Sequence, residues 1–247
     1  IDAVIMGCVL PAGLGQAPAR QAALKAGLSD HTVCTTVNKM CGSGMQAVIL
    51  AHDAIIAGTH NTCVAGGMEN MTRTPYLLEK ARFGYRIGKG TIIDHMMHDG
   101  LEDAYQAGTS MGEFAEACAQ KYHFSREQQD AFASRSLKRA QSAAAEGMFN
   151  PEICSISINN KASELSITQD EGPLTLSEQK IKTLKPAFIK DGTITAANAS
   201  SISDGAAALQ LMRQSQAKQL GLTPLAKSMA YVTYAQQPEW FSTAPTY

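Results

Sequence analysis

The chain lacks paired cysteines, an excess of one charge and a large aromatic content. Its six cysteines are scattered without C-x-x-C spacing, which argues against a disulfide framework or a zinc cluster and favours a reducing, cytoplasmic compartment. Lysine and arginine number 21 against 22 aspartates and glutamates, so no global positive field indicates binding to nucleic acid or an anionic membrane. A phosphate-bearing ligand would have to be held by local groups.

Long apolar runs, internal repeats and an initiator methionine are also missing. The sequence therefore predicts neither a bilayer-spanning segment nor a signal peptide. The chain starts with Ile1-Asp2-Ala3 as if within a strand, which suggests an incomplete N-terminus and leaves open a lost targeting segment. Its 247 residues, 45% of them hydrophobic, suffice for one large or two small domains with a sizeable core.

Strand-like and helical segments alternate over the first 74 residues. The rhythm is typical of a mainly parallel sheet covered by helices. Strands are predicted over residues 1–9, 33–37 and 62–66, and helices over 17–26 and 45–57.

Residues 75–202 break this rhythm and predict an inserted α+β domain. The Gly- and Arg-rich residues 82–90 indicate a loop. Helices are predicted over 112–122 and 126–146, the second with a Ser125–Gln128 capping box and a stop at Gly147. A hairpin is expected from residues 152–158 and 164–168, with Asn159-Asn160-Lys161 as its turn.

Residues 203–226 return to the first style. Asp204-Gly205 is expected to open a helix over 206–220, and residues 227–234 to form a new strand. The predicted domains are thus 1–74 together with 203–226, the insertion 75–202, and 227–247 as the start of a second domain.

Cys41 lies between a predicted strand and a predicted helix, in Asn38-Lys39-Met40-Cys41-Gly42-Ser43-Gly44. A thiol at the mouth of a helix faces unpaired backbone N–H groups and the positive end of the helix dipole, which favours the nucleophilic thiolate. Gly42 and Gly44 allow a substrate to approach the backbone closely. The alternative is that Cys41 is a small buried hydrophobe, as most intracellular cysteines are.

Residues 38–48 resemble the nucleophile segment of the thiolases, in which this cysteine carries the acyl group. The Cys-Gly-Ser-Gly form is more similar to the biosynthetic acetoacetyl-CoA thiolases than to the degradative long-chain ones, which tend to have Cys-Ser-Ser-Gly. Residues 62–71, with Ala-Gly-Gly-Met-Glu, and residues 198–208, with Asn-Ala-Ser and Asp-Gly-Ala-Ala, resemble two further thiolase signatures. The three strings, in the family's order, extend the resemblance over almost the whole chain.

The resemblance implies an α/β thiolase-like fold: a β-α-β-α-β N-terminal domain with an inserted loop domain, and a second domain that is mostly absent because the chain is truncated at both ends. It implies acyl transfer, in which Cys41 takes an acetyl group from acetyl-CoA and a second acetyl-CoA attacks it to give acetoacetyl-CoA, or the reverse thiolysis. Acyl-CoA substrates, no metal or redox cofactor, and a homodimer or homotetramer are also implied.

Five residues are carried over as coenzyme A contacts. Ser200 matches a family position that binds the coenzyme A arm, Ala199 lies beside it, and three apolar residues match positions that line the pantetheine: Leu101, Met111 and Phe188.

Two departures affect the expected nucleotide binding. Ser110 stands where many members have histidine, and the arginine expected before residue 184 has no clear match, since Pro173 falls about there. The available basic residues, most of them expected to be solvated, are Arg82, Arg86, Lys89 and Lys185.

The remaining catalytic groups of the family define the alternatives. Its activating base, second cysteine and oxyanion hole come from Asn-Glu-Ala-Phe, Gly-His-Pro and Cys-x-Gly-Gly-Gly segments of the second domain, and none occurs in this sequence. A degradative 3-ketoacyl-CoA thiolase of longer chain specificity stays open, to be decided by pocket residues at Leu101, Met111 and Phe241. So does a non-catalytic CoA-binding or scaffold protein. A plain oligomerisation module is least favoured, since it leaves the glycine-rich strings unexplained.

Three polar positions carry competing interpretations. Glu69 follows an apolar strand and would pair with a buried arginine or a neighbouring subunit, or simply end the strand, which we favour. Asp204 is interpreted as the N-cap of the next helix. His95 and His98 with Asp99 make a metal site conceivable, but no further ligand cluster follows, so surface or ligand-loop histidines are favoured.

Overall fold

The computed structural model describes residues 1–160 and 163–247. They form two compact units: residues 1–109 with 202–235, called the first unit, and residues 110–201 with 236–247, called the second unit. The three-part domain division expected from the sequence stays a prediction.

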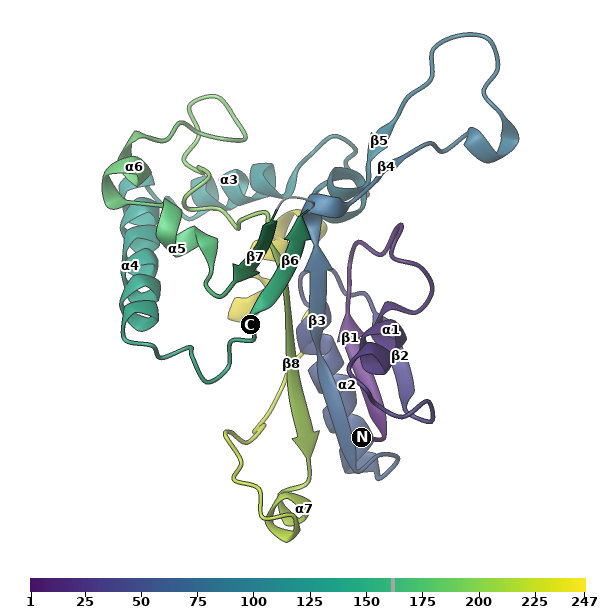
Figure 1. Ribbon diagram of the computed structural model, residues 1–247. Helices are drawn as coiled ribbons and strands as arrows, with labels where there is room; N and C mark the ends of the chain where they lie inside the picture. Colours follow the sequence, from purple (N-terminus) through teal and green to yellow (C-terminus); the bar gives the residue numbers. More distant parts are fainter. Residues whose placement is uncertain (161–162) are drawn as a thin grey trace. The chain divides into compact units, whose positions relative to one another are not determined.

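The first unit is built on a four-stranded sheet of order β2-β1-β3-β8. β1 (Ala3–Gly7) runs parallel to both β2 (Val33–Val37) and β3 (Thr62–Asn70). β8 (Asp204–Met212) adds antiparallel to β3 over nine residue pairs, and the two long strands lie side by side in Figure 1. The parallel part matches the alternating strand and helix pattern of the sequence, because parallel neighbours need crossover connections.

Helices cover both faces of the parallel strands. α2 (Ser43–Ala57) packs its small and branched residues against Ala3, Ile5 and Ala65. α1 (Pro18–Lys25) covers the other face through Ala19 and Ala23. Buried strands with both faces covered carry continuous apolar runs, which is why β1 is buried at all five positions.

Residues 206–220 do not form the predicted helix. The chain instead forms β8, a short loop and α7 (Gln214–Gln219), and Asp204 begins a strand and does not cap a helix. The expectation was wrong because Ala, Leu, Gln and Met favour helix locally, whereas the free edge of β3 offers nine backbone partners. Tertiary pairing overrides local propensity here.

The predicted strand at residues 227–234 is also absent, since this stretch of the described chain has no assigned strand or helix. Its β-rich composition is not enough, because a strand needs an edge to pair with. α2 corrects another expectation: residues Met40–Ala57 are long and apolar enough to cross a membrane by length and composition. In this structure one face of α2 packs on the sheet, and 28% of this segment is buried.

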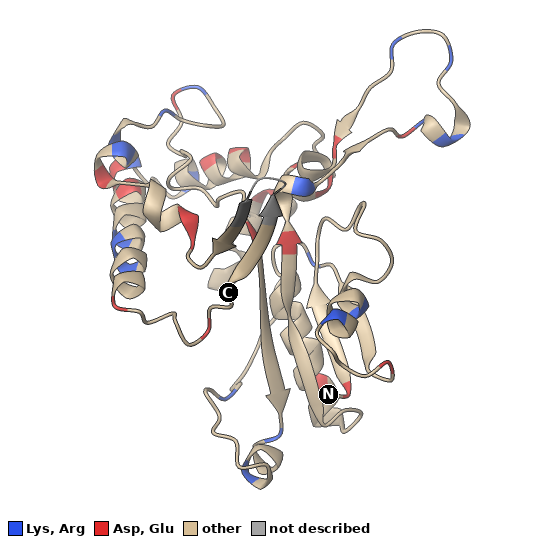
Figure 2. Ribbon diagram, in the orientation of Figure 1, with Lys and Arg blue, Asp and Glu red and all other residues tan. Residues whose placement is uncertain are grey.

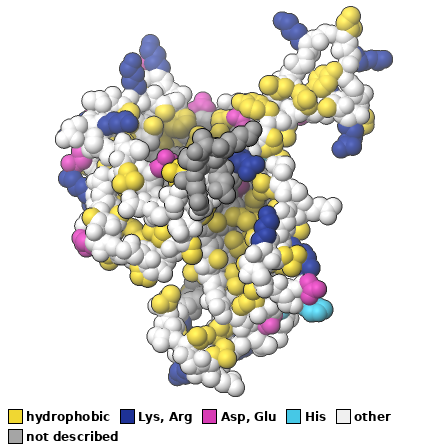
Figure 3. Space-filling model, in the orientation of Figure 1, with side chains coloured by type: hydrophobic (Ala, Val, Ile, Leu, Met, Phe, Trp, Pro, Cys, Tyr) yellow, Lys and Arg dark blue, Asp and Glu magenta, His cyan; other side chains and the backbone are white. Residues whose placement is uncertain are grey.

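A narrow hairpin projects from the first unit after β3. The 3-10 turn η1 (Met71–Arg73) leads to β4 (Tyr76–Leu77), which pairs with β5 (Ile93–Asp94), and the predicted loop lies between them with the short turn η2 (Ala81–Phe83). Figure 3 shows apolar and basic side chains together along it. The π-helix η3 (Met97–Leu101) follows.

The second unit contains the two predicted helices, α3 (Met111–Lys121) and α4 (Arg126–Ala145). The Ser125–Gln128 capping box is confirmed, and Gly147 takes the left-handed φ of 69° just beyond α4. An unforeseen capping box, Ser110–Glu113, starts α3. Charges of both signs follow α4, as Figure 2 shows, which is typical of a solvated helix face.

The rest of the second unit is short elements. The hairpin is β6 (Ile156–Asn160) and β7 (Ser163–Ile167), so Asn159 and Asn160 lie in a strand, while Lys161 of the expected turn lies outside the described residues. Two short helices follow, α5 (Glu171–Thr175) and α6 (Glu178–Thr183). The 3-10 segment η4 (Pro238–Thr246) packs on α3 through Phe241 and Phe114, whose ring centroids are 6.5 Å apart.

Candidate functional site

Cys41 occupies the turn between β2 and α2, as the sequence predicts. Cys41 is exposed and its thiol is free, whereas Cys8 and Cys63 are buried. The buried-hydrophobe interpretation of Cys41 is therefore wrong. The residue that caps α2 is Gly42, and no described side chain caps the helix. The first N–H groups of α2 are thus left to the backbone, solvent or a ligand.

The turn around Cys41 is held in an unusual conformation. Met40, just before the cysteine, has a left-handed φ of 49°, which is uncommon for a residue with a side chain. Ser43, buried in the first turn of α2, stabilises it: its hydroxyl donates to the Met40 carbonyl at 2.6 Å and accepts from the Lys39 amide at 2.8 Å. Strain held in this way commonly accompanies a functional site.

The start of α2 lies very close to the end of β1. A Cβ atom added to Gly7 would lie 2.5 Å from the carbonyl carbon of Ser43 and 2.6 Å from the amide nitrogen of Gly44. Both are backbone atoms, so only glycine allows this approach. The sequence showed glycines beyond Cys41 but gave no sign that Gly7 seats the helix.

A pocket of about 380 Å³ opens beside Cys41 within the first unit. Small residues line most of it, so backbone atoms are within reach of a bound molecule. The lining residues come from the ends of β1 and β3, the start of α2 and the start of β8: Gly7, Val9, Met40, Cys41, Ser43, Gly44, Gly67, Met68, Glu69, Gly205, Ala206 and Ala207. All three glycine-rich strings noted in the sequence contribute to it.

Glu69 anchors the loop that follows β1. Its carboxylate accepts from the backbone amides of Val9 at 2.8 Å and Leu10 at 3.0 Å, and Cys8 Sγ lies 3.7 Å from Oε1. No arginine among the described residues pairs with Glu69, and its contacts within the chain fit the structural role that the sequence favours, whereas pairing with a neighbouring subunit stays a prediction. Burial, followed by the charge of Glu69, raises the pKa of the Cys8 thiol to about 11, so Cys8 stays protonated at neutral pH.

Asp204 has a role that sequence reasoning missed. Its carboxylate accepts from the amide of Thr72 at 3.0 Å and from the Thr72 hydroxyl, which joins the start of β8 to the turn after β3. The Thr72 hydroxyl, followed by the Thr72 amide, lowers the pKa of Asp204. Nothing in the local sequence pairs two residues so far apart.

The five predicted coenzyme A residues fall on both units. Leu101 ends η3 in the first unit and is half-buried. Met111 begins α3 in the second unit, where the ring of Phe188 packs against the adjacent Gly112. Ala199 and the exposed Ser200 follow a tight turn of the second unit. The structure therefore places the Phe188 ring against Gly112, the residue that follows Met111, and the five coenzyme A contacts stay predictions.

The histidine cluster does not form a metal site in the described part of the chain. His95 is buried and its Nδ1 lies 2.6 Å from Asp99 Oδ2, and no group of three metal-ligating side chains occurs among the described residues. The i,i+4 pair instead fixes the ring within the turn that leads into η3.

Comparisons with known proteins agree with this geometry. The thiolase N-terminal domain family matches residues 1–215. A probable acetyl-CoA acetyltransferase from Dictyostelium discoideum is 47% identical over 99% of this chain and 59% of its own length. An acetyl-CoA acetyltransferase from Escherichia coli is 48% identical over 99% of this chain and 62% of its own length. The chain thus spans about three fifths of such relatives.

Solved structures give the same result. The Acat5 thiolase from Ascaris suum, solved in complex with coenzyme A, superposes with a TM-score of 0.90 and 38% identity, covering 99% of this chain and 62% of its own. The acetyl-CoA acetyltransferase of Bacillus anthracis superposes with a TM-score of 0.85 and 39% identity, covering 91% of this chain and 57% of its own. The predicted fold class is confirmed, and the chain belongs to the thiolase family.

Proposed function

We propose that this protein transfers acyl groups between coenzyme A thioesters through a covalent intermediate on Cys41, in the manner of an acetyl-CoA acetyltransferase. One observation carries the proposal: an exposed, free cysteine stands at the start of α2 beside a glycine-lined pocket of about 380 Å³. The names of relatives near 47% identity support the same chemistry. The chain spans about three fifths of the length of these relatives, so we propose their activity for this protein on the basis of that part.

The first half of the reaction follows from the position of the thiol. The Cys41 thiolate attacks the thioester carbonyl, the C–S bond to coenzyme A breaks, and the departing thiolate takes up the proton that Cys41 has lost. The positive end of the α2 dipole lies at this site and attracts negative charge. Glycines in the pocket wall leave room for the acyl group beside the backbone.

In the second half, the α-carbon of another acetyl-CoA loses a proton to a base, which in the family comes from second-domain segments that do not occur in this sequence. The carbanion attacks the acyl carbonyl, the bond to sulfur breaks, and Cys41 is freed as acetoacetyl-CoA forms. The reverse direction is thiolysis. We assign binding of the coenzyme A arm to Ser200, Ala199, Met111, Phe188 and Leu101. The exposure of Ser200 and the packing of the Phe188 ring against Gly112, next to Met111, support that assignment.

Acetyl transfer can be read directly by mass. The chain is incubated with acetyl-CoA, and the adduct is mapped by peptide mass spectrometry. We expect acetyl on Cys41 in the parent and in Cys154→Ala, a matched control because Cys154 is also an exposed free thiol, and none at that position in Cys41→Ala. Acetyl on Cys154 alone, or none in a chain whose Cys41 still reacts with iodoacetamide, would contradict the proposal.

We further propose that the protein self-associates, as the family resemblance implies. The hairpin between β4 and β5 supports this, because Phe83 and Ile87 on it are 89% and 106% exposed. Apolar side chains gathered at such a projection mark an interaction surface. Sedimentation velocity of the parent and of Phe83→Ser/Ile87→Ser tests the idea: the variant should be the smaller species, and equal sedimentation of the two would contradict it.

A further inference from the structure

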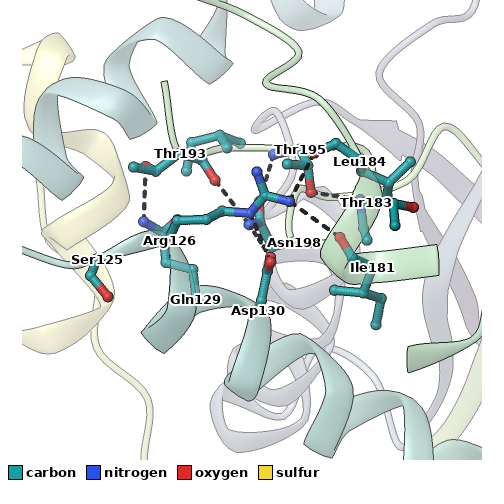
Figure 4. A network of polar contacts seen from close by, with 12 residues as sticks. Ser125, Arg126, Gln129, Asp130, Ile181, Thr183, Leu184, Thr193, Thr195 and Asn198 are labelled. Atoms are coloured by element: carbon teal, nitrogen blue, oxygen red, sulfur yellow. Dashed lines mark hydrogen bonds and ion pairs between the residues drawn. The ribbon is translucent and has the colours of Figure 1, made fainter. Parts of the chain in front are cut away.

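A chain of polar contacts in the second unit connects α4 to the segment that carries Phe188. Arg126 and Asp130 stand on successive turns of α4, with Nε and Oδ2 2.7 Å apart. Arg126 also donates to the carbonyls of Ile181, at 3.2 Å, and Leu184, at 2.9 Å. Figure 4 shows the guanidinium between these acceptors. One cation thus fixes both the carboxylate beside it and the chain leading to Phe188.

The second oxygen of Asp130 continues the network. Its Oδ1 accepts from the side-chain amide of Asn198 at 3.1 Å, and the same nitrogen donates to the Thr193 carbonyl at 3.1 Å (Figure 4). The other end of Asn198, Oδ1, accepts from the Thr195 amide at 2.8 Å. With acceptors at one end and a donor at the other, the amide fits in only one orientation.

Asn198 closes a tight turn that ends at Ser200. Thr195 is completely buried, and its carbonyl accepts from the amides of Asn198, at 3.3 Å, and Ala199, at 3.0 Å. Its hydroxyl accepts from the Ala197 amide at 3.3 Å. Ser200 follows Ala199 directly and is exposed. The position of Ser200 is therefore set by a turn whose shape depends on Asn198.

Buried Glu116 of α3 holds the other end of this segment. It accepts from the Thr193 amide at 2.8 Å and the Ile194 amide at 2.7 Å. A Cβ on Gly192 would overlap the Glu116 carboxylate, so a larger residue there would displace this side chain. The Ile194 carbonyl accepts from the Ala187 amide at 2.9 Å, which ties the turn to the residue before Phe188.

We propose that Asn198 and Asp130 are positioning residues for coenzyme A: they hold Ser200 and the Phe188 segment in the arrangement that binds the arm, without touching it themselves. The inference rests on the proposed function. Its physical basis is that buried polar networks hold one geometry when every member is satisfied. Asp130 is 9% exposed, its charge is matched by Arg126, and both its oxygens have partners.

The test is a double-mutant cycle read by isothermal titration of coenzyme A into the 247-residue chain. Asn198→Ala should weaken binding roughly tenfold, because the Asp130 carboxylate and the Thr195 amide each lose a hydrogen-bond partner. Ser200→Ala should weaken it too. Because Asn198 acts through Ser200, the loss from Asn198→Ala should shrink in the Ser200→Ala background, as coupled sites do. If Asn198 has a merely structural role, the fold-losses in affinity from Asn198→Ala and Ser200→Ala should simply multiply in the double variant.

Controls separate the outcomes. Gln141→Ala removes bonds from α4 to the Pro173 and Leu176 carbonyls, outside this network, and should leave affinity within about twofold. If Asn198→Ala binds coenzyme A as the parent does, or if the two losses are multiplicative, this inference is overturned while the proposed function stands. If the parent does not bind coenzyme A, both the proposed arm contacts and this inference are overturned. If Asn198→Ala melts without a cooperative transition, Asp130→Asn replaces it, and parent-like affinity in that folded variant overturns the inference.

Discussion

Replacing Gly7 by alanine tests whether close seating of α2 sets the Cys41 turn. The added Cβ would lie 2.5 Å from the carbonyl carbon of Ser43, and real Cβ contacts are essentially never below 3.0 Å. The start of α2 must therefore retreat by about half an ångström or more. Overpacking of this kind costs about 1–3 kcal/mol, so we expect a loss of about 2 kcal/mol in the free energy of unfolding. For a chain of this size that lowers Tm by roughly 4–8 °C.

Two assays decide the point. Thermal unfolding followed by circular dichroism gives the stability, and the rate of iodoacetamide modification at Cys41 reports on the turn. Gly172→Ala is the matched control, because nothing lies within 4 Å of the added Cβ and α5 is helical there, so alanine should be neutral or stabilising. A Gly7→Ala protein with the parent's Tm and alkylation rate would refute the reasoning.

Three further predictions follow from the polar contacts. At pH 8, iodoacetamide should modify exposed Cys41 well before Cys8, whose pKa is raised to about 11, and peptide mapping that finds Cys8 labelled first would contradict this. The lowered pKa of Asp204 adds stability that is present above the unfolded carboxyl pKa and lost as pH falls through the folded one, so Thr72→Val should flatten the acid limb of a Tm–pH curve below about pH 4. Ser125→Ala, which removes the α4 capping box, should lower the free energy of unfolding by about 1 kcal/mol in urea titrations, and an unchanged midpoint would oppose it.

The parallel core could be predicted from the sequence because its signals are local. The strand predicted over residues 33–37 coincides with β2, and the helix predicted over 45–57 begins two residues later than α2 does. The same holds for α4, whose capping box reads directly from Ser125 and Gln128. Such elements combine a periodic apolar pattern with a start and a stop signal, so neighbours in the chain suffice to define them.

The errors share a different cause. The sequence predicts a helix where β8 lies because seven of its nine residues are good helix formers, and only the distant edge of β3 makes it a strand. The candidate site likewise has one part that local sequence predicts and another that depends on distant contacts. Cys41 was visible in its own string, whereas the anchoring of Glu69 on the Val9 and Leu10 amides depends on backbone atoms that no sequence pattern reports.

The pairing of β3 with β8 also bears on how the first unit assembles. The Thr72 amide bonds to Asp204, which lies 132 residues further along the chain. On a ribosome, β1, β2 and β3 emerge long before β8, and β3 would present an open edge throughout that interval. Closing so long a loop is entropically costly, although the cost grows only slowly with length. Structure formed early within residues 110–201 would shorten the free segment, so the order of synthesis favours folding of this part of the second unit before β8 pairs with β3.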